Sequence, residues 1–119
     1  MHDLAEKLAE LLTAKGVYEK VLVDNVTGEC AVLVAKRGAT LHLIALSTHN
    51  DWVYAKIALS DAVPLRAWSC SNIFYTPYGL YAFAHTLDEL ADKIAGKQDR
   101  LEAQARILEE ALRSGASLE

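Results

Sequence analysis

Two nearly continuous apolar stretches, residues 30–35 and 41–46, constrain the fold of this chain more than any other feature. Their lengths suit strands, and an apolar run without polar alternation is typical of a strand that is buried on both faces. The segment Lys36-Arg37-Gly38-Ala39, followed by Thr40, separates the stretches, and the glycine favours a tight turn. We therefore predict a central hairpin that other elements must cover on both sides.

The elements on either side of this hairpin follow from apolar spacing. Leucines at helical spacing predict a first helix, which Asp3 would cap and which would end at Gly16. Apolar and aromatic runs between turn-forming residues predict four more strands. These strands are residues 21–23, 52–59, 73–75 and 80–83.

Helices are predicted between and after these strands. Asp61 is expected to cap a short helix over 62–71, with Pro64 in its first turn. Thr86 and Glu89 have the spacing of a capping box. The box predicts the start of a helical region that extends to residue 114 and that Gly96 and Lys97 divide into two helices. These helices are residues 87–95 and 98–114.

Composition limits the class of protein. The chain has 119 residues, of which 52% are hydrophobic and 24% charged, and its formal net charge is −4. This apolar content suffices for one packed domain, and no apolar run approaches the roughly 18 residues of a membrane span. The acidic excess argues against a strongly basic nucleic-acid binder. We divide the chain into an α/β core over 1–85, a helical extension over 86–117, and residues 118–119, which resemble an expression-tag remnant.

The two cysteines, Cys30 and Cys70, are too few for a disulfide framework, and neither belongs to a CxxC motif. Cys30 lies in an apolar strand, where a thiol packs as a small hydrophobic group. We therefore expect both thiols to be reduced and the protein to be cytoplasmic.

The order of these elements resembles a known fold. The resemblance covers the helix ending LLTAKG, the segment GECAVLVAKRG and the segment LHLIALS. Together they resemble the core of the restriction-endonuclease-like (PD-(D/E)XK) nuclease superfamily. This resemblance implies an α/β fold with a helix, a three-stranded meander, a crossover helix and a further strand. The long C-terminal helical extension is a departure from that pattern.

The same resemblance implies which residues to inspect for nuclease chemistry. Members of the superfamily hold Mg²⁺ with carboxylates, and a lysine helps to activate the attacking water. The matching positions here are Ala31, Ala45 and Ser47, none of which supplies the carboxylate or lysine that this chemistry requires. The resemblance thus implies a nuclease-like chain without catalytic or metal-binding residues and without a cofactor. The chain is also similar to the structural subunits of archaeal tRNA-splicing endonucleases, which assist an active partner.

Candidate binding residues lie elsewhere in the chain. Lys36 and Arg37, at the predicted hairpin tip, are candidates for contact with nucleic-acid phosphates. Tyr75, Tyr78 and Tyr81 flank a Pro-Tyr-Gly turn and are candidates for subunit contacts. Apolar residues recur along the last predicted helix, which is longer than its own domain needs. The interface residues predicted there are Leu101, Ile107, Leu108 and Leu112.

We expect a non-catalytic subunit or scaffold that acts by homo- or hetero-association, with nucleic acid bound through a partner and no contact with membranes. Three alternatives remain open. The chain can be a nucleic-acid-binding module, or a hydrolase that uses residues such as His49, Asp51 or Glu29. In place of the nuclease fold, it can form an antiparallel meander of four strands held between the two helical ends. Parallel pairing of a strand at 73–76 with the strand at 41–46 would distinguish the two folds.

Overall fold

The computed structural model describes residues 1–63 and 68–113, without the side chains of Ala62 and Leu108. Its centre is a five-stranded sheet in the order β1-β2-β3-β4-β5. Each neighbouring pair of strands is antiparallel. The strands are β1 (Lys20–Thr27), β2 (Cys30–Arg37), β3 (Thr40–His49), β4 (Trp52–Leu59) and β5 (Leu80–Ala84).

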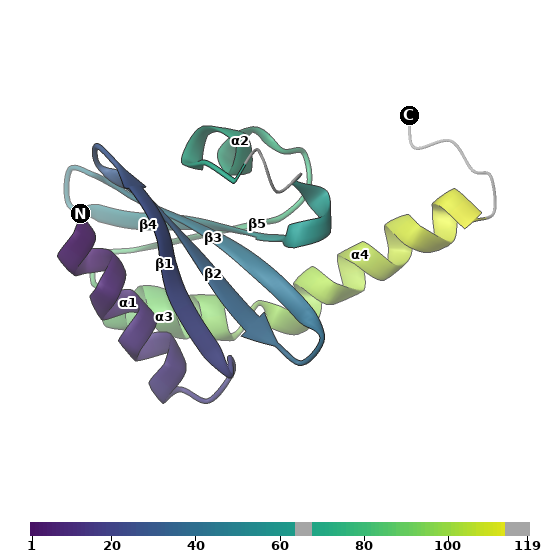
Figure 1. Cartoon of the computed structure of the whole chain (residues 1–119), viewed down its shortest axis with the longest axis horizontal. Helices are drawn as coiled ribbons and strands as arrows, with labels where there is room; N and C mark the ends of the chain where they lie inside the picture. Colours follow the sequence, from purple (N-terminus) through teal and green to yellow (C-terminus); the bar gives the residue numbers. More distant parts are fainter. Residues whose placement is uncertain (64–67, 114–119) are drawn as a thin grey trace.

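Helices lie on both faces of this sheet (Figure 1). One face carries α1 (His2–Ala14) and α3 (Leu87–Ala95), which share its larger hydrophobic core. The other face carries α2 (Cys70–Tyr75) over a smaller core, preceded by a short 3-10 helix, η1 (Ser60–Ala62). The last helix, α4 (Gln98–Arg113), follows α3 and extends away from the body of the molecule (Figure 1).

The central hairpin is buried on both faces, as predicted. Leu33 of β2 and Ile44 of β3 are fully buried in the core under α1 and α3. Val32 and Leu43, their neighbours in sequence, are fully buried in the core under α2. Because successive side chains of a strand point to opposite faces, both layers of helices are needed to keep this hairpin out of water.

The predicted helix boundaries hold at one end of the chain and fail at the other. Thr86 accepts a hydrogen bond from the Glu89 backbone at 3.2 Å, so the predicted cap of α3 is confirmed. The break at 96–97 between two helices is confirmed as well. The expected Asp3 cap is wrong, because α1 already begins at His2 and has no side-chain cap.

The strand predicted at 73–75 is wrong, because these residues form the end of α2. The Ser69 hydroxyl accepts from the backbone N–H of Asn72 and starts this helix. At its other end, the Lys56 ammonium donates to the backbone carbonyls of Phe74, at 3.2 Å, and Thr76. These contacts, together with the burial of Ile73, outweigh the strand preference of the aromatic residues.

The observed sheet therefore matches the antiparallel alternative, with a fifth strand added. Both neighbours of β3 are antiparallel strands, β2 and β4, so the parallel partner expected from the nuclease resemblance does not lie beside it. The helix predicted over 62–71 falls partly on 64–67, outside the described residues. Its beginning is the 3-10 helix η1 and its end is the start of α2.

The expectation of reduced thiols is also wrong, because Cys30 and Cys70 form a disulfide. Their Cα atoms lie 6.2 Å apart, one at the start of β2 and the other at the start of α2. No local pattern indicates this pairing, since 40 positions separate the two cysteines. The bond ties α2 to the sheet face that it covers.

Reduction of this disulfide is expected to destabilise the fold. A loop of this length predicts a loss of up to about 4 kcal/mol in the free energy of unfolding, because the reduced unfolded chain gains conformational freedom. Urea titration with and without a reductant measures the loss. A chain with Cys30→Ser and Cys70→Ser should have the lower stability at the outset and be insensitive to the reductant. An unchanged unfolding midpoint of the native chain under reductant would contradict the prediction.

Among the glycines that the structure describes, Gly79 is the one whose replacement should lower the free energy of unfolding most. Its φ is +124°, and a Cβ there would lie 2.6 Å from the backbone oxygen of Ile57. Gly79→Ala should therefore lower the free energy of unfolding by at least about 2 kcal/mol. Gly28 is a matched control, since its φ is +62° but a Cβ there would meet open space. Gly28→Ala should cost only about 1 kcal/mol, and equal losses for the two variants would refute the steric argument.

Candidate functional site

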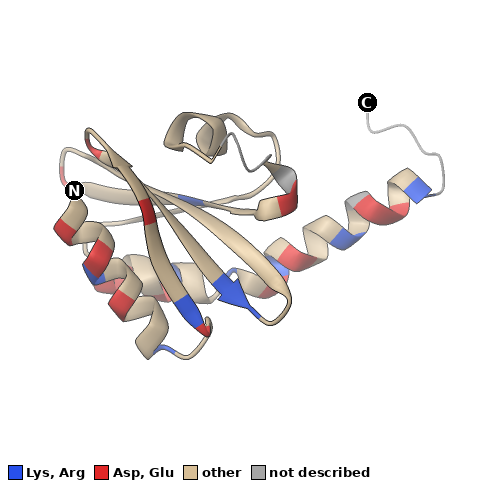
Figure 2. Cartoon of the chain, in the orientation of Figure 1, with Lys and Arg blue, Asp and Glu red and all other residues tan. Residues whose placement is uncertain are grey.

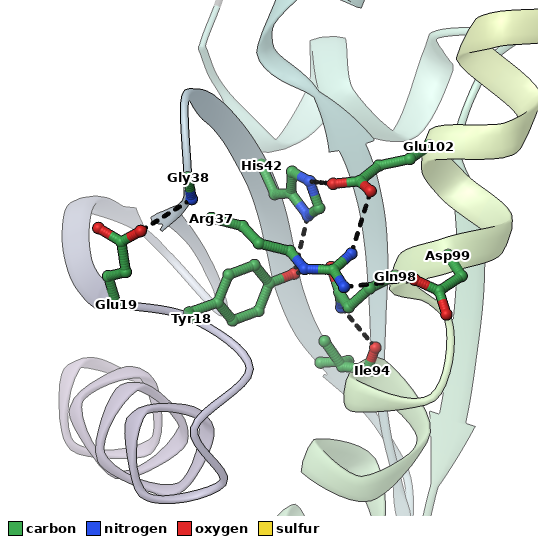
Figure 3. Close-up of polar contacts among 9 residues, drawn as sticks. All are labelled: Tyr18, Glu19, Arg37, Gly38, His42, Ile94, Gln98, Asp99 and Glu102. Carbon is green, nitrogen blue, oxygen red and sulfur yellow. Dashed lines mark hydrogen bonds and ion pairs between the residues drawn. The ribbon is translucent and has the colours of Figure 1, made fainter.

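The first turn of α4 is attached to the sheet by a buried polar cluster (Figure 3). Gln98 is 2% exposed, and its side chain bonds in two directions. Its Oε1 accepts from the Tyr18 hydroxyl at 2.6 Å, and its Nε2 donates to the backbone oxygen of Ile94 at 2.6 Å. Leu101, also 2% exposed, packs into the main core one turn later. These contacts fix where α4 leaves the body.

The contacts of Gln98 determine the protonation pattern of His42, a fully buried residue of β3. Tyr18 has one hydroxyl proton, and Gln98 accepts it. The His42 Nδ1 lies 3.0 Å from the same hydroxyl oxygen, so Nδ1 must be the donor in that bond. In the neutral ring, Nε2 then carries the lone pair. This nitrogen has no hydrogen-bond partner among the described residues.

Two charged residues complete the cluster. Glu102 of α4 lies between Arg37 and His42, with its carboxylate 3.2 Å from Arg37 Nη1 and 3.5 Å from His42 Nε2. Asp99 approaches the other Arg37 nitrogen at 3.3 Å. The guanidinium at the end of β2 is thus bound by two carboxylates from the first turns of α4. The Arg37 and Glu102 side chains are each about two-thirds buried, so loss of either one leaves the other charge partly buried without its partner.

Burial dominates the electrostatics of the cluster. It raises the pKa of Tyr18 above its ordinary value, so this phenol remains a hydrogen-bond donor at any physiological pH. Burial also lowers the pKa of His42, while the bond with Gln98 and the carboxylate of Glu102 oppose that shift and Arg37 adds to it. Apart from His42 Nε2 and Arg37 Nη1, the buried polar atoms of the cluster bond to one another or to nearby backbone, and these contacts fix the orientation of α4.

A pH dependence of stability follows from the lowered pKa of His42. The unfolded chain binds a proton at this residue near the ordinary pKa of 6.5, more readily than the folded chain does. The stability that neutral His42 provides is therefore complete above pH 6.5 and is lost as the pH falls below it, by at most about 1.4 kcal/mol per pH unit for one proton. Urea titrations at several pH values measure this slope.

The His42 contribution can be separated from that of other groups. His42→Asn keeps a donor near the position of Nδ1 but cannot titrate, so this variant should lose part of the slope. His49→Asn, at an exposed histidine of the same strand, should keep it. Identical slopes for the native chain and His42→Asn would contradict the assignment.

The predicted nucleic-acid contacts, Lys36 and Arg37, both lie beside carboxylates. Arg37 binds Asp99 and Glu102 as described above, and the Lys36 ammonium lies 3.6 Å from Glu19. Figure 2 shows that charged residues of both signs alternate along α4. The role of Lys36 and Arg37 in phosphate binding stays a prediction, with less free positive charge at the hairpin tip than the sequence suggests.

The positions that match the nuclease catalytic residues lie in the sheet. Ala31 and Ala45 are fully buried, and the Ser47 hydroxyl donates to the backbone oxygen of Glu29 at 3.0 Å. Among residues 1–63 and 68–113, no group of three His, Cys, Asp or Glu side chains is arranged to hold a metal ion.

The predicted interface tyrosines have different environments. Tyr75 is 86% exposed at the end of α2, and Tyr78 is partly exposed in the following turn. Tyr81 of β5 lies over α2, and its hydroxyl donates to the backbone oxygen of Phe74 at 3.0 Å. Tyr81 also belongs to a larger set of neighbouring rings, which we call the aromatic surface. Its members are Trp52, Tyr54, Phe74, Tyr81 and Phe83.

The aromatic surface continues past the area that α2 covers. Trp52, Tyr54 and Phe83, together with His49, line a shallow depression of about 460 Å³. The sequence prediction did not identify this site. The signal was present, because the alternation that directs Val53 and Ala55 toward the main core directs Trp52 and Tyr54 to the opposite face.

The predicted apolar stripe on α4 is buried only at its start. Leu101 lies in the core, whereas Ile107 and Leu112 are each 66% exposed. The side chain of Leu108 lies outside what the structure describes. No helix among the described residues has the length and apolar character needed to cross a membrane.

No protein-family model matches this chain, and comparison with curated proteins and with solved structures finds no similar protein. Its function is therefore inferred from its own residues.

Proposed function

We propose that this chain is a non-catalytic protein that acts by association, and that α4 pairs with the α4 of a second copy. The observation behind this proposal is that one side of α4 is apolar both where it is buried and where it is exposed. Leu112 follows Leu101 by 11 positions, which is close to three helical turns, so both point to nearly the same side. That side is buried at Leu101 and exposed at Leu112.

The attachment of α4 supports this role. The contacts of Gln98 and Glu102 orient the helix at its root, so its exposed part is presented in a defined direction. A pre-oriented helix loses less conformational entropy on binding than a free segment does. Ile107, in the next turn before Leu112, borders a groove that Leu80 of β5 also lines. Because Ile107 lies about 140° around the helix from Leu112, a partner helix on the side of Leu101 and Leu112 would cover Leu112, and Ile107 would lie outside its centre.

A nuclease ancestry is a separate proposal, and association through α4 does not depend on it. In that proposal the chain would be the structural partner of an active endonuclease, since Ala31, Ala45 and Ser47 replace the catalytic residues that the resemblance implies. The described strands pair only antiparallel, however, and a nuclease ancestry would have to account for this difference. A cytoplasmic location likewise remains a proposal, whereas the Cys30–Cys70 disulfide favours an oxidising compartment.

The association is tested by sedimentation equilibrium at rising protein concentration. The native chain should shift from monomer to dimer. Ile107→Gln with Leu112→Gln should weaken the dimer at least about tenfold, because full burial of the Leu112 side chain alone contributes roughly 1.5–3 kcal/mol. Glutamine keeps a high helix propensity, so α4 itself should persist.

The matched control is Arg106→Gln with Glu109→Gln, which changes two other exposed residues of α4 and leaves the net charge unchanged. This variant should dimerise like the native chain. A native chain that remains monomeric throughout, or a dimer that both double variants weaken equally, would rule out pairing through the apolar face of α4.

A further inference from the structure

The aromatic surface carries a second inference, independent of association through α4. Its rings form a connected patch across two strands. Tyr54 and Phe83 face each other across β4 and β5 with ring centroids 5.8 Å apart, and Phe83 continues to Tyr81 at 6.0 Å. Trp52 lies against the His85 ring at 3.9 Å. Trp52 and Phe83 are nonetheless 43% and 49% exposed.

Two polar groups of this patch are free to form hydrogen bonds with a ligand. Neither the Trp52 indole N–H nor the Tyr54 hydroxyl has a hydrogen-bond partner among the described residues, whereas the Trp68 indole donates to Val63. Both groups belong to side chains that line the depression. The depression thus offers donors beside aromatic faces.

Charge at the depression restricts the class of ligand. Its lining residues are His49, Trp52, Tyr54 and Phe83, none of which is a lysine, arginine or carboxylate. A nucleic acid needs cations for its phosphates, and phosphopeptides need arginine clusters. The net charge of −4 further disfavours such anions. An uncharged ligand that presents hydrogen-bond acceptors and apolar rings is the better match.

We propose that the aromatic surface around this depression binds a proline-rich segment of a partner protein. Proline residues present carbonyl acceptors and no N–H, which complements the donors of Trp52 and Tyr54. A polyproline II helix is already extended in the free peptide, and aromatic-lined grooves bind it with little ordering cost.

The test uses the whole chain and a dye-labelled peptide of about ten prolines, which adopts polyproline II. Fluorescence anisotropy should show saturable binding, and a glycine-serine peptide of the same length should not bind. Trp52→Ala should weaken binding at least tenfold, since it removes both a ring and a donor. Tyr54→Phe keeps the ring and should weaken binding roughly fivefold through loss of one hydrogen bond.

Tyr75→Ala is the control, because Tyr75 is an exposed aromatic residue outside the depression. This variant should bind like the native chain. Circular dichroism checks that each variant is folded, and Tyr54→Phe keeps the test decisive should Trp52→Ala unfold. Absence of saturable binding would overturn the proposal, as would equal affinity of the native chain and Tyr54→Phe. Tighter binding of a single-stranded oligonucleotide, lost in Trp52→Ala, would also overturn it.

The two proposals can fail separately. Trp52→Ala should leave the sedimentation behaviour unchanged, and the α4 double variant should leave peptide affinity unchanged. Loss of peptide binding in the α4 variant would show that the depression works only within the dimer and would overturn its independence.

Discussion

Burial of the β2–β3 hairpin on both faces is the constraint on which the rest of the structure depends. Leu33 and Ile44 need a cover on one side, and Val32 and Leu43 need another on the opposite side. The first cover consists of two regular helices, α1 and α3. The second is smaller, and α2 owes its position to a disulfide and to the buried ammonium of Lys56. Because α2 is short, this cover is incomplete and the aromatic surface remains exposed beside it.

The two covers also explain where the two proposed contact surfaces lie. His42 and His49 belong to the same strand but point to opposite faces, because an odd number of positions separates them. His42 lies at the root of α4, and His49 lines the aromatic depression. Seven positions correspond to roughly 23 Å along a strand. The root of α4 and the aromatic depression are therefore separated both by the thickness of the sheet and by most of the length of β3.

Local patterns predicted those parts of the fold that depend on neighbouring residues. Apolar runs located the central strands, and Thr86 with Gly96 located the ends of α3. The prediction failed for residues 73–75, where the sequence favours a strand but distant contacts from Lys56 and Cys30 hold a helix. It also missed the cluster around His42. Its members come from five separate segments of the chain, so no spacing within the sequence connects them.

The polar cluster has a consequence for how α4 can act. Glu102 binds a guanidinium and faces the lone pair of neutral His42, so its two contacts respond differently to protons. Protonation of His42 would strengthen the contact with Glu102 but would bury an additional charge beside Arg37. The burial of His42 makes the second effect the larger one. Neutral His42 is thus the favoured state of the folded chain, and in that state the contacts of Gln98 and Glu102 hold the root of α4.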